Sequence, residues 1–126
     1  MITASLKNYR ISPRKVRLVA DMVRGKGVAD AKNILTYAMK KAKGPIHDLL
    51  DSAIANAAHN HKIEADALFV KEIRVDQGVV LKRSRPMARG SAFPIKKRTS
   101  HISLVLEARE IKSVKSKGIS KVAKTK

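Results

Sequence analysis

The chain has 126 residues, no cysteine, and 28 basic against 10 acidic side chains, which gives a formal net charge of +18. This length predicts a single domain, and the lack of cysteine excludes disulfides, thiolate metal sites and a cysteine nucleophile. No apolar run reaches the roughly 20 residues of a membrane span, and the start has no apolar segment of signal-peptide type. We therefore expect a soluble, intracellular protein without a membrane partner.

The basic charge is concentrated in three regions. Residues 1–29, 77–111 and 112–126 each carry a net charge of +6, whereas residues 30–76 are neutral. At this density self-repulsion works against the compact state until a polyanion neutralises it. A phosphate backbone is the expected partner, because each neutralised phosphate also releases condensed counterions.

The first half of the chain predicts one strand and three helices. Residues 1–10 alternate in polarity as a short strand does. Residues 12–25 predict a helix with Ser12 as its N-cap, Pro13 at the first helical position and Gly25 after the last turn. Two further helices are predicted over residues 28–41 and, after a break at Gly44-Pro45, over residues 46–61. The expected apolar faces consist of Ile2, Ala4 and Leu6 on the strand, and of Val16, Val19, Ala20, Val23, Val28, Ala31, Leu35, Ala38, Ile46, Leu49, Leu50, Ala53, Ile54 and Ala57 on the helices.

The basic side of the first predicted helix has two interpretations. It is either a solvated face, with an ion pair between Arg17 and Asp21 one turn further on, or a surface that contacts phosphate. The charge segregation favours phosphate contact, because the basic residues crowd a helix N-terminus that already attracts anions. The residues concerned are Arg10, Arg14, Lys15 and Arg17.

Two long extended runs, residues 67–83 and 96–109, predict a β-hairpin. The apolar parity changes between Val70 and Ile73, which indicates a bulge in the first run. The basic halves of the two runs cannot cover helices, so they should form an arm of about 30 Å that leaves the domain. An isolated two-stranded ribbon is marginal in water, so a partner is expected to hold this arm.

Catalytic and metal-binding motifs are weak in this chain. His59 and His61, with Glu64 and Asp66 nearby, are a possible ligand set, but the spacing is loose and a polar turn after a helix explains it better. Phosphate-binding glycine loops and a serine nucleophile elbow are missing from the sequence. We therefore expect neither an enzyme nor a bound metal or cofactor.

Composition also bears on the kind of nucleic acid. Single-strand readers usually stack bases on aromatic side chains, and here only Phe93 lies in a basic setting. Recognition of phosphates and shape is therefore expected. A histone-like DNA-bending protein with a basic β-arm is the alternative, with Pro86, Met87, Phe93 and Pro94 as candidate wedges between base steps.

Three blocks of the sequence resemble a known family. SPRKVRLVADMVRGK, SAIANAAHNH and RPMARGSAFPIKKRTSHISLVL occur in the order found in the bacterial-type ribosomal protein twenty-two of the large subunit, and the resemblance spans about residues 5 to 109. It implies an α+β fold in which three helices pack on a small three-stranded antiparallel sheet, with a long protruding β-hairpin. The domain would cover residues 1–110, with the arm at about 78–98. Residues 111–126 would form a basic, disordered C-terminal tail outside the family pattern.

The resemblance also implies a function and its partners. A structural constituent of the large ribosomal subunit would bind large-subunit rRNA, support its assembly, and line the nascent-peptide tunnel with its hairpin tip. Neighbours would be ribosomal protein number four of the large subunit, the nascent peptide and nearby macrolide antibiotics, in a cytoplasmic or an organellar ribosome. The implied rRNA-binding residues are Arg10, Arg14, Lys15, Arg17, Lys82, Arg83, Arg85, Arg89, Lys96, Lys97, Arg98, Thr99 and His101. The implied tunnel-lining tip residues are Arg85, Pro86, Met87, Ala88, Arg89, Gly90 and Ser91.

Overall fold

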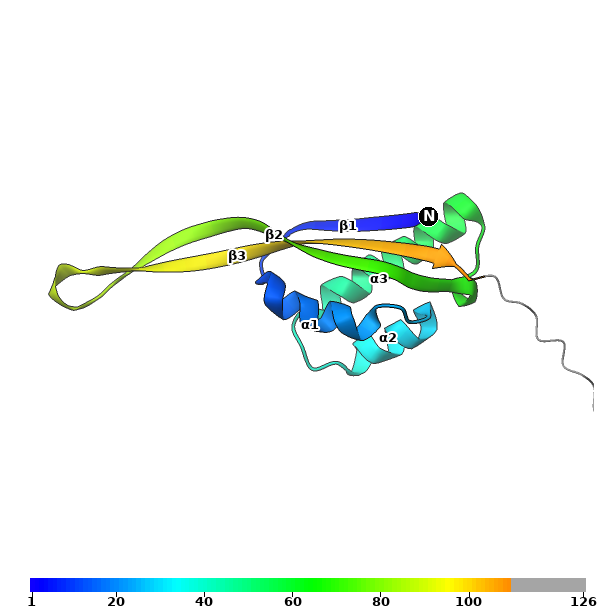
Figure 1. Ribbon diagram of the computed structural model, residues 1–126, viewed down its shortest axis with the longest axis horizontal. Coiled ribbons are helices and arrows are strands. Elements are labelled where there is room, and N and C mark those ends of the chain that lie inside the picture. Colours follow the sequence, from blue (N-terminus) through cyan, green and yellow to red (C-terminus); the bar gives the residue numbers. More distant parts are fainter. Residues whose placement is uncertain (110–126) are drawn as a thin grey trace, which may run out of the picture.

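A three-stranded antiparallel sheet is the framework of the fold (Figure 1). The computed structural model describes residues 1–109. The strands are β1 (Ile2–Tyr9), β2 (Leu68–Pro86) and β3 (Ala92–Ala108), in the order β1-β3-β2. The central strand β3 pairs with β1 from Ile2↔Leu106 to Tyr9↔Ser100, and with β2 over its whole length. The predicted α+β class and hairpin are confirmed.

Three helices cover one face of this sheet (Figure 1). They are α1 (Pro13–Val23), α2 (Val28–Tyr37) and α3 (Lys43–Asn56). A π-helical turn, Ala57–His61, and a short 3-10 turn, Ala65–Ala67, lead from α3 into β2. The second layer is therefore built entirely by residues that precede the hairpin.

The core between the two layers is aliphatic, as the small number of aromatic residues predicts. The predicted stripe of α1 is fully buried, and the apolar faces of α2 and α3 meet the sheet residues Ile73, Ile102 and Leu104. Of the apolar positions predicted for the helices, only Ile54 is half-buried rather than buried. Burial of this kind contributes roughly 25 cal/mol per Å² of apolar surface, and it holds the helices against the neutral half of the hairpin.

The boundaries of two helices differ from the sequence expectation. α2 ends at Tyr37 instead of continuing to residue 41, so the following lysines lie in a connection. α3 begins at Lys43, so Gly44 and Pro45 lie within its first turn and do not break it. Proline is tolerated there because the N–H groups of the first turn have no partner inside the helix.

The hairpin continues far beyond the helical layer as a two-stranded arm (Figure 1). The register runs from Leu68↔Ala108 to Pro86↔Ala92, with shifts between Val70 and Glu72 and between Gln77 and Val80. The first shift confirms the predicted bulge. β1 ends opposite Ser100, so the arm beyond that point, near residues 78–98, has no third strand. At the tip, Arg89 and Gly90 adopt positive φ angles of 58° and 72°, which lets the chain reverse.

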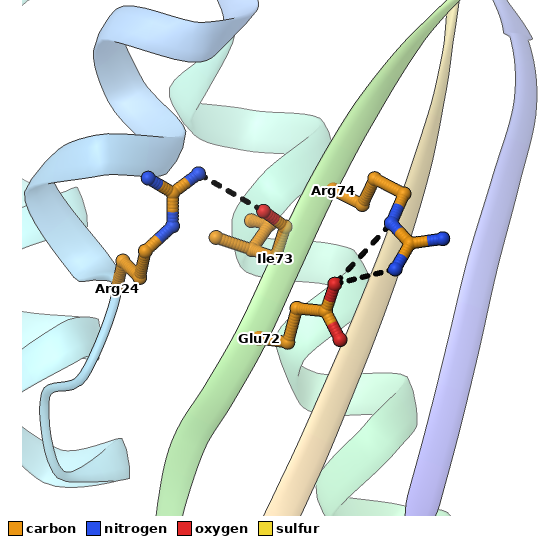
Figure 2. A network of polar contacts seen from close by, with 4 residues as sticks. All are labelled: Arg24, Glu72, Ile73 and Arg74. Atoms are coloured by element: carbon orange, nitrogen blue, oxygen red, sulfur yellow. Dashed lines mark hydrogen bonds and ion pairs between the residues drawn. The ribbon is translucent and has the colours of Figure 1, made fainter.

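The outer edge of β2 is covered by α1 and the segment that follows it. Gly25 donates to the Val70 carbonyl at 3.0 Å, and Val70 donates to the Lys26 carbonyl at 2.9 Å. Further along the edge, Arg24 donates to the carbonyl of Ile73 at 3.1 Å (Figure 2). Arg17 donates to the Val75 carbonyl at 3.0 Å from Nη2 and 3.2 Å from Nε. These contacts occupy carbonyl groups that would otherwise offer a template for another strand.

The ion pair between Arg17 and Asp21, which belonged to the solvated-face interpretation, does not form. Asp21 pairs with Arg24 at 2.7 Å, three residues on, and not with Arg17, because the Arg17 guanidinium is held by β2. On the strand itself, Glu72 accepts from Arg74 at 2.7 Å (Figure 2), and this carboxylate raises the pKa of Arg74. α1 therefore uses its arginines to hold the sheet edge.

Candidate nucleic-acid interface

A basic groove of about 930 Å³ lies where the root of the arm, the start of α1 and the α2–α3 connection meet. Eight of its fifteen lining residues are cationic and none is acidic. The cations are Arg10, Lys15, Lys40, Lys41, Arg83, Lys96, Lys97 and Arg98. A lining of this kind favours anions over neutral or cationic groups, because it concentrates positive charge from three elements in one place.

The helical side of the groove is positioned by local backbone structure. Arg10 lies in the turn after β1, where Ile11 donates to the Tyr9 carbonyl at 2.8 Å. Lys15 is in the first turn of α1, whose N-terminal N–H groups add a partial positive charge. Lys15 thus reaches the groove from a helix end that already favours anions, and Arg10 reaches it from the turn just before that helix.

The α2–α3 connection supplies Lys40 and Lys41, which the sequence interpretation did not include. The Tyr9 hydroxyl donates to the Lys41 carbonyl at 3.4 Å, and Lys43 Nζ donates to the Thr36 carbonyl at 3.1 Å, so both ends of the connection are held. Burial raises the pKa of Tyr9 above its ordinary value of 10.0. Because residues 30–76 are neutral as a whole, averaging the charge hid this local run of lysines.

The arm side of the groove consists of Arg83 on β2 and the run from Lys96 to Arg98 on β3. Lys82 lies directly opposite Lys96 in the register. Like charges in this position are destabilising in water. An anion between the two side chains would relieve that repulsion.

Two predicted RNA-binding residues, Thr99 and His101, lie at the root of the arm, where Thr99 also lines the groove. Thr99 is only 5% exposed, and its hydroxyl donates to the Val79 carbonyl at 2.7 Å. His101 Nδ1 accepts from the Asn8 N–H at 3.0 Å. Beside them the buried Ser100 hydroxyl donates to the Ile11 carbonyl at 3.0 Å. Their observed contacts join the arm to β1 and to the start of α1.

The other predicted site residues lie outside the groove. Arg14 is exposed on α1, and Arg17 lines a smaller depression of about 430 Å³ beside Asp21 and Glu72. Lys82, Arg85 and the whole tip from Pro86 to Ser91 are exposed further out along the arm. The tip is closed by the Met87 N–H, which donates to the Ser91 carbonyl at 2.8 Å. The predicted set is therefore spread over a groove, a shaft and a tip.

Two histidines, His59 of the possible ligand set and His47 on α3, have other polar neighbours. His59 Nδ1 lies 3.1 Å from Asn60 Oδ1, and His47 pairs with Asp51 at 3.2 Å. Within residues 1–109 no three potential ligands gather in a metal-binding arrangement. Over the same residues, no helix is long and apolar enough to cross a membrane.

Fold and groove together define a class: small, strongly basic α+β proteins that carry a long β-arm and a cation-lined surface. Comparison with known families makes the assignment specific. The sequence profile of the family described as "Ribosomal protein L22p/L17e" matches residues 4–107. The chain belongs to this family, and the resemblance drawn from the three sequence blocks is confirmed.

Curated relatives agree with the family match over nearly the same residues. A protein of Bdellovibrio bacteriovorus is 52% identical over 106 residues, which cover 84% of this chain and 96% of the relative. Proteins of Desulfitobacterium hafniense strain Y51 and Deinococcus radiodurans are 56% and 53% identical, covering 82% of this chain and 90% and 77% of the relatives. Each is named "Large ribosomal subunit protein uL22". The chain is thus a structural ribosomal protein of the large subunit, of a family that is not enzymatic.

The predicted C-terminal tail is covered neither by the family profile nor by the described part of the structure. The family profile ends at residue 107, and residues 110–126, which hold the predicted basic tail, are outside the described residues. The prediction that residues 111–126 are disordered therefore stays a prediction.

Proposed function

We propose that this ribosomal protein binds large-subunit rRNA through the basic groove and the arm, and so supports folding and assembly of the subunit. The observation that carries the proposal is the groove itself, with eight cationic side chains and no acidic one from three separate elements. Its binding free energy would come mainly from phosphate contacts, which weaken steeply as salt rises. Family membership favours rRNA over the DNA-bending alternative.

The outer arm would serve a second purpose. As the family resemblance implies, the tip from Arg85 to Ser91 would line the nascent-peptide tunnel, facing protein number four, near the site of macrolide antibiotics. In support, the tip is exposed, and it lies at the far end of the molecule from the helical layer (Figure 1). The three relatives come from bacteria, which favours the cytoplasmic ribosome over an organellar one.

Sedimentation tests the proposed rRNA binding. The tagged full chain is expected to co-migrate with large subunits through a wash at moderate salt, and to bind protein-free large-subunit rRNA with a steep salt dependence. Duplex DNA of matched length is the control and should bind more weakly. Loss from the subunit in the wash, or equal affinity for DNA, would contradict the proposal.

Shortening the arm tests the division of labour. Deletion of residues 87–92 removes Arg89 but no groove cation, so rRNA binding by the groove should persist, with a salt slope lower by at most about one. Ribosomes that carry the deletion should change in macrolide sensitivity or in the passage of arrest-prone nascent peptides. Failure of subunit assembly in this variant would show that assembly needs the tip and would contradict the proposed division of labour.

A further inference from the structure

Apolar side chains line the basic groove although the protein covers little of them. Leu18 on α1 is 58% exposed, and Met39, just after α2, is 98% exposed. Ile11 and Leu81 continue the same lining and are half-buried. Phosphate contacts come from cationic and polar groups, so a groove for phosphates alone has no use for this strip.

The size of the groove limits what can cover these side chains. Its volume of about 930 Å³ falls within the range of roughly 300–1,000 Å³ that is usual for sites of small organic ligands. A double helix presents its phosphates outward and keeps its bases stacked, so it can touch the cations but cannot place a base in the groove. An unstacked nucleotide can reach both the cations and the apolar strip.

We propose that the groove binds a single-stranded segment of rRNA, with its phosphates on the cations and one unstacked base packed against Leu18 and Met39. This inference rests on the proposed rRNA binding and deepens it by naming the form of RNA. Sequence-specific RNA recognition favours unpaired segments, whose splayed bases pack on side chains. Here aliphatic groups take the place of aromatic ones, and burial of their apolar surface under the base favours the complex.

The charge pattern argues against a protein segment as the occupant. On the helical side the groove is lined by Lys40 and Lys41 from the connection, with Lys15 from α1. Their repulsion is relieved by a regularly spaced polyanion, and a phosphate chain supplies one charge for each nucleotide. An acidic peptide is the competing class, and it enters the experiment as a competitor.

Substitution of Met39 separates base packing from phosphate binding. Because Met39 is almost fully exposed, both Met39→Trp and Met39→Lys should leave the fold intact. The full-length variants are titrated with a single-stranded RNA of about ten nucleotides, a length within the site sizes of single-strand binders, and with the same strand in a duplex. The titrations are repeated at several salt concentrations.

The two substitutions have opposite expected signatures. Met39→Trp should tighten single-strand binding by about fivefold with an unchanged salt slope, because bases stack on aromatic rings. Met39→Lys should instead steepen the slope of log K against log salt by up to about one. Leu18→Ala should weaken single-strand binding about threefold, again without a change of slope. Met22→Trp is the matched control, because Met22 is an exposed residue of α1 that does not line the groove.

Several outcomes would overturn the inference. The first is a Met39→Trp variant that binds single-stranded RNA no more tightly than the original chain or the Met22→Trp control. The second is duplex RNA that binds as tightly as the single strand. The third is displacement of the bound RNA by a poly-glutamate peptide at equal charge. The proposed function is judged separately, by binding of the original chain to protein-free large-subunit rRNA. If that binding holds and the Met39 variants do not differ, only the single-strand assignment fails.

Discussion

Gly78 lies where the arm leaves the domain, and the packing at this point leaves no room for a side chain. A Cβ at this position would collide with the Thr99 hydroxyl and lie 3.1 Å from His101 Nε2. Both neighbours are engaged, Thr99 with the Val79 carbonyl and His101 with the Asn8 N–H. The glycine therefore allows the two strands to close over the buried threonine.

Gly78→Ala is expected to destabilise the free protein. Adding a methyl group to a filled site costs roughly 1–3 kcal/mol of stability. Here the Thr99 hydroxyl can move away from the new methyl group only by breaking its hydrogen bond to the Val79 carbonyl. The measurement is the midpoint of urea unfolding at constant m-value. Gly44→Ala is the control, because open space surrounds Gly44 in the first turn of α3 and alanine favours the helix. Equal midpoints for the two variants would contradict this account of the arm root.

The same neighbourhood shows what residue types alone cannot reveal. Thr99 and His101 belong to the third of the sequence blocks that resemble the family, and both carry polar groups that can contact RNA. The structure gives both a partner within the chain. A hydroxyl or imidazole can bond to a backbone group or to RNA, and only the fold decides which backbone groups come within reach.

At the scale of elements, α1 and the edge of β2 are joined by hydrogen bonds from arginine side chains to backbone carbonyl groups. The sequence places Arg17 on the polar side of α1, and an i,i+4 rule pairs it with Asp21. In the fold, the carbonyls of Val75 and Ile73 face α1 from the unpaired edge of β2, and Arg17 and Arg24 bond to them. Acceptors from a strand some 50 residues away are invisible to helical periodicity.

Arg17→Met and Lys15→Met should therefore behave differently. Arg17→Met is expected to lower the free energy of unfolding by about 1 kcal/mol, because hydrogen bonds from a charged donor to a partly exposed carbonyl are lost. It should change the salt slope of rRNA binding little. Lys15→Met should do the reverse, reducing the slope by up to about one while stability stays within about 0.5 kcal/mol.

Paired unfolding and binding measurements on the two variants check this expectation. Arg14→Met is the control for stability, since Arg14 is exposed on the same helix and its side chain makes no hydrogen bond to residues 1–109. If Arg17→Met lowered the salt slope as much as Lys15→Met, Arg17 would act in RNA binding, as the family resemblance implied, and its contact with Val75 would be secondary.

The positions of the helices could be predicted from the sequence because their buried residues recur with the helical period. Apart from the half-buried Ile54, the stripes predicted for the three helices consist of buried residues. The ends were less predictable. Ala38 is buried and keeps the register of α2, yet α2 ends before it, so burial outlasts the helix. Gly44-Pro45 resembles a break, but the first turn of a helix accepts both residues.

At the scale of the whole molecule, the net charge of successive sequence segments predicted the arm but not the groove. The net charge of +6 over residues 77–111 indicates the arm, because the cations of the arm all fall within one short segment of the sequence. The groove draws its eight cations from residues 10 to 98, and Lys40 and Lys41 come from the neutral region. A site assembled from three elements becomes visible only when the elements are placed together.

The division between domain and arm is also physical. The core residues end at Val75 on β2 and resume at Ile102 on β3, and every residue from 82 to 98 is exposed. The outer arm thus adds charge and reach but no buried apolar surface to the domain. Its strands are held by backbone pairing alone, which is marginal for an isolated ribbon.

Replacing residues 83–95 with Asn-Gly tests this division in one variant. The new turn follows the pair Lys82↔Lys96 and suits a tight hairpin, so the shortened arm should close without strain. The free energy of unfolding should stay within about 1 kcal/mol of the original, because no buried side chain is removed. Loss of Arg83, Arg85 and Arg89 should reduce the salt slope of rRNA binding by up to about two to three. Urea unfolding and salt titrations of the purified variant measure the two quantities, and a loss of stability of several kcal/mol would show that the arm supports the domain from which it extends.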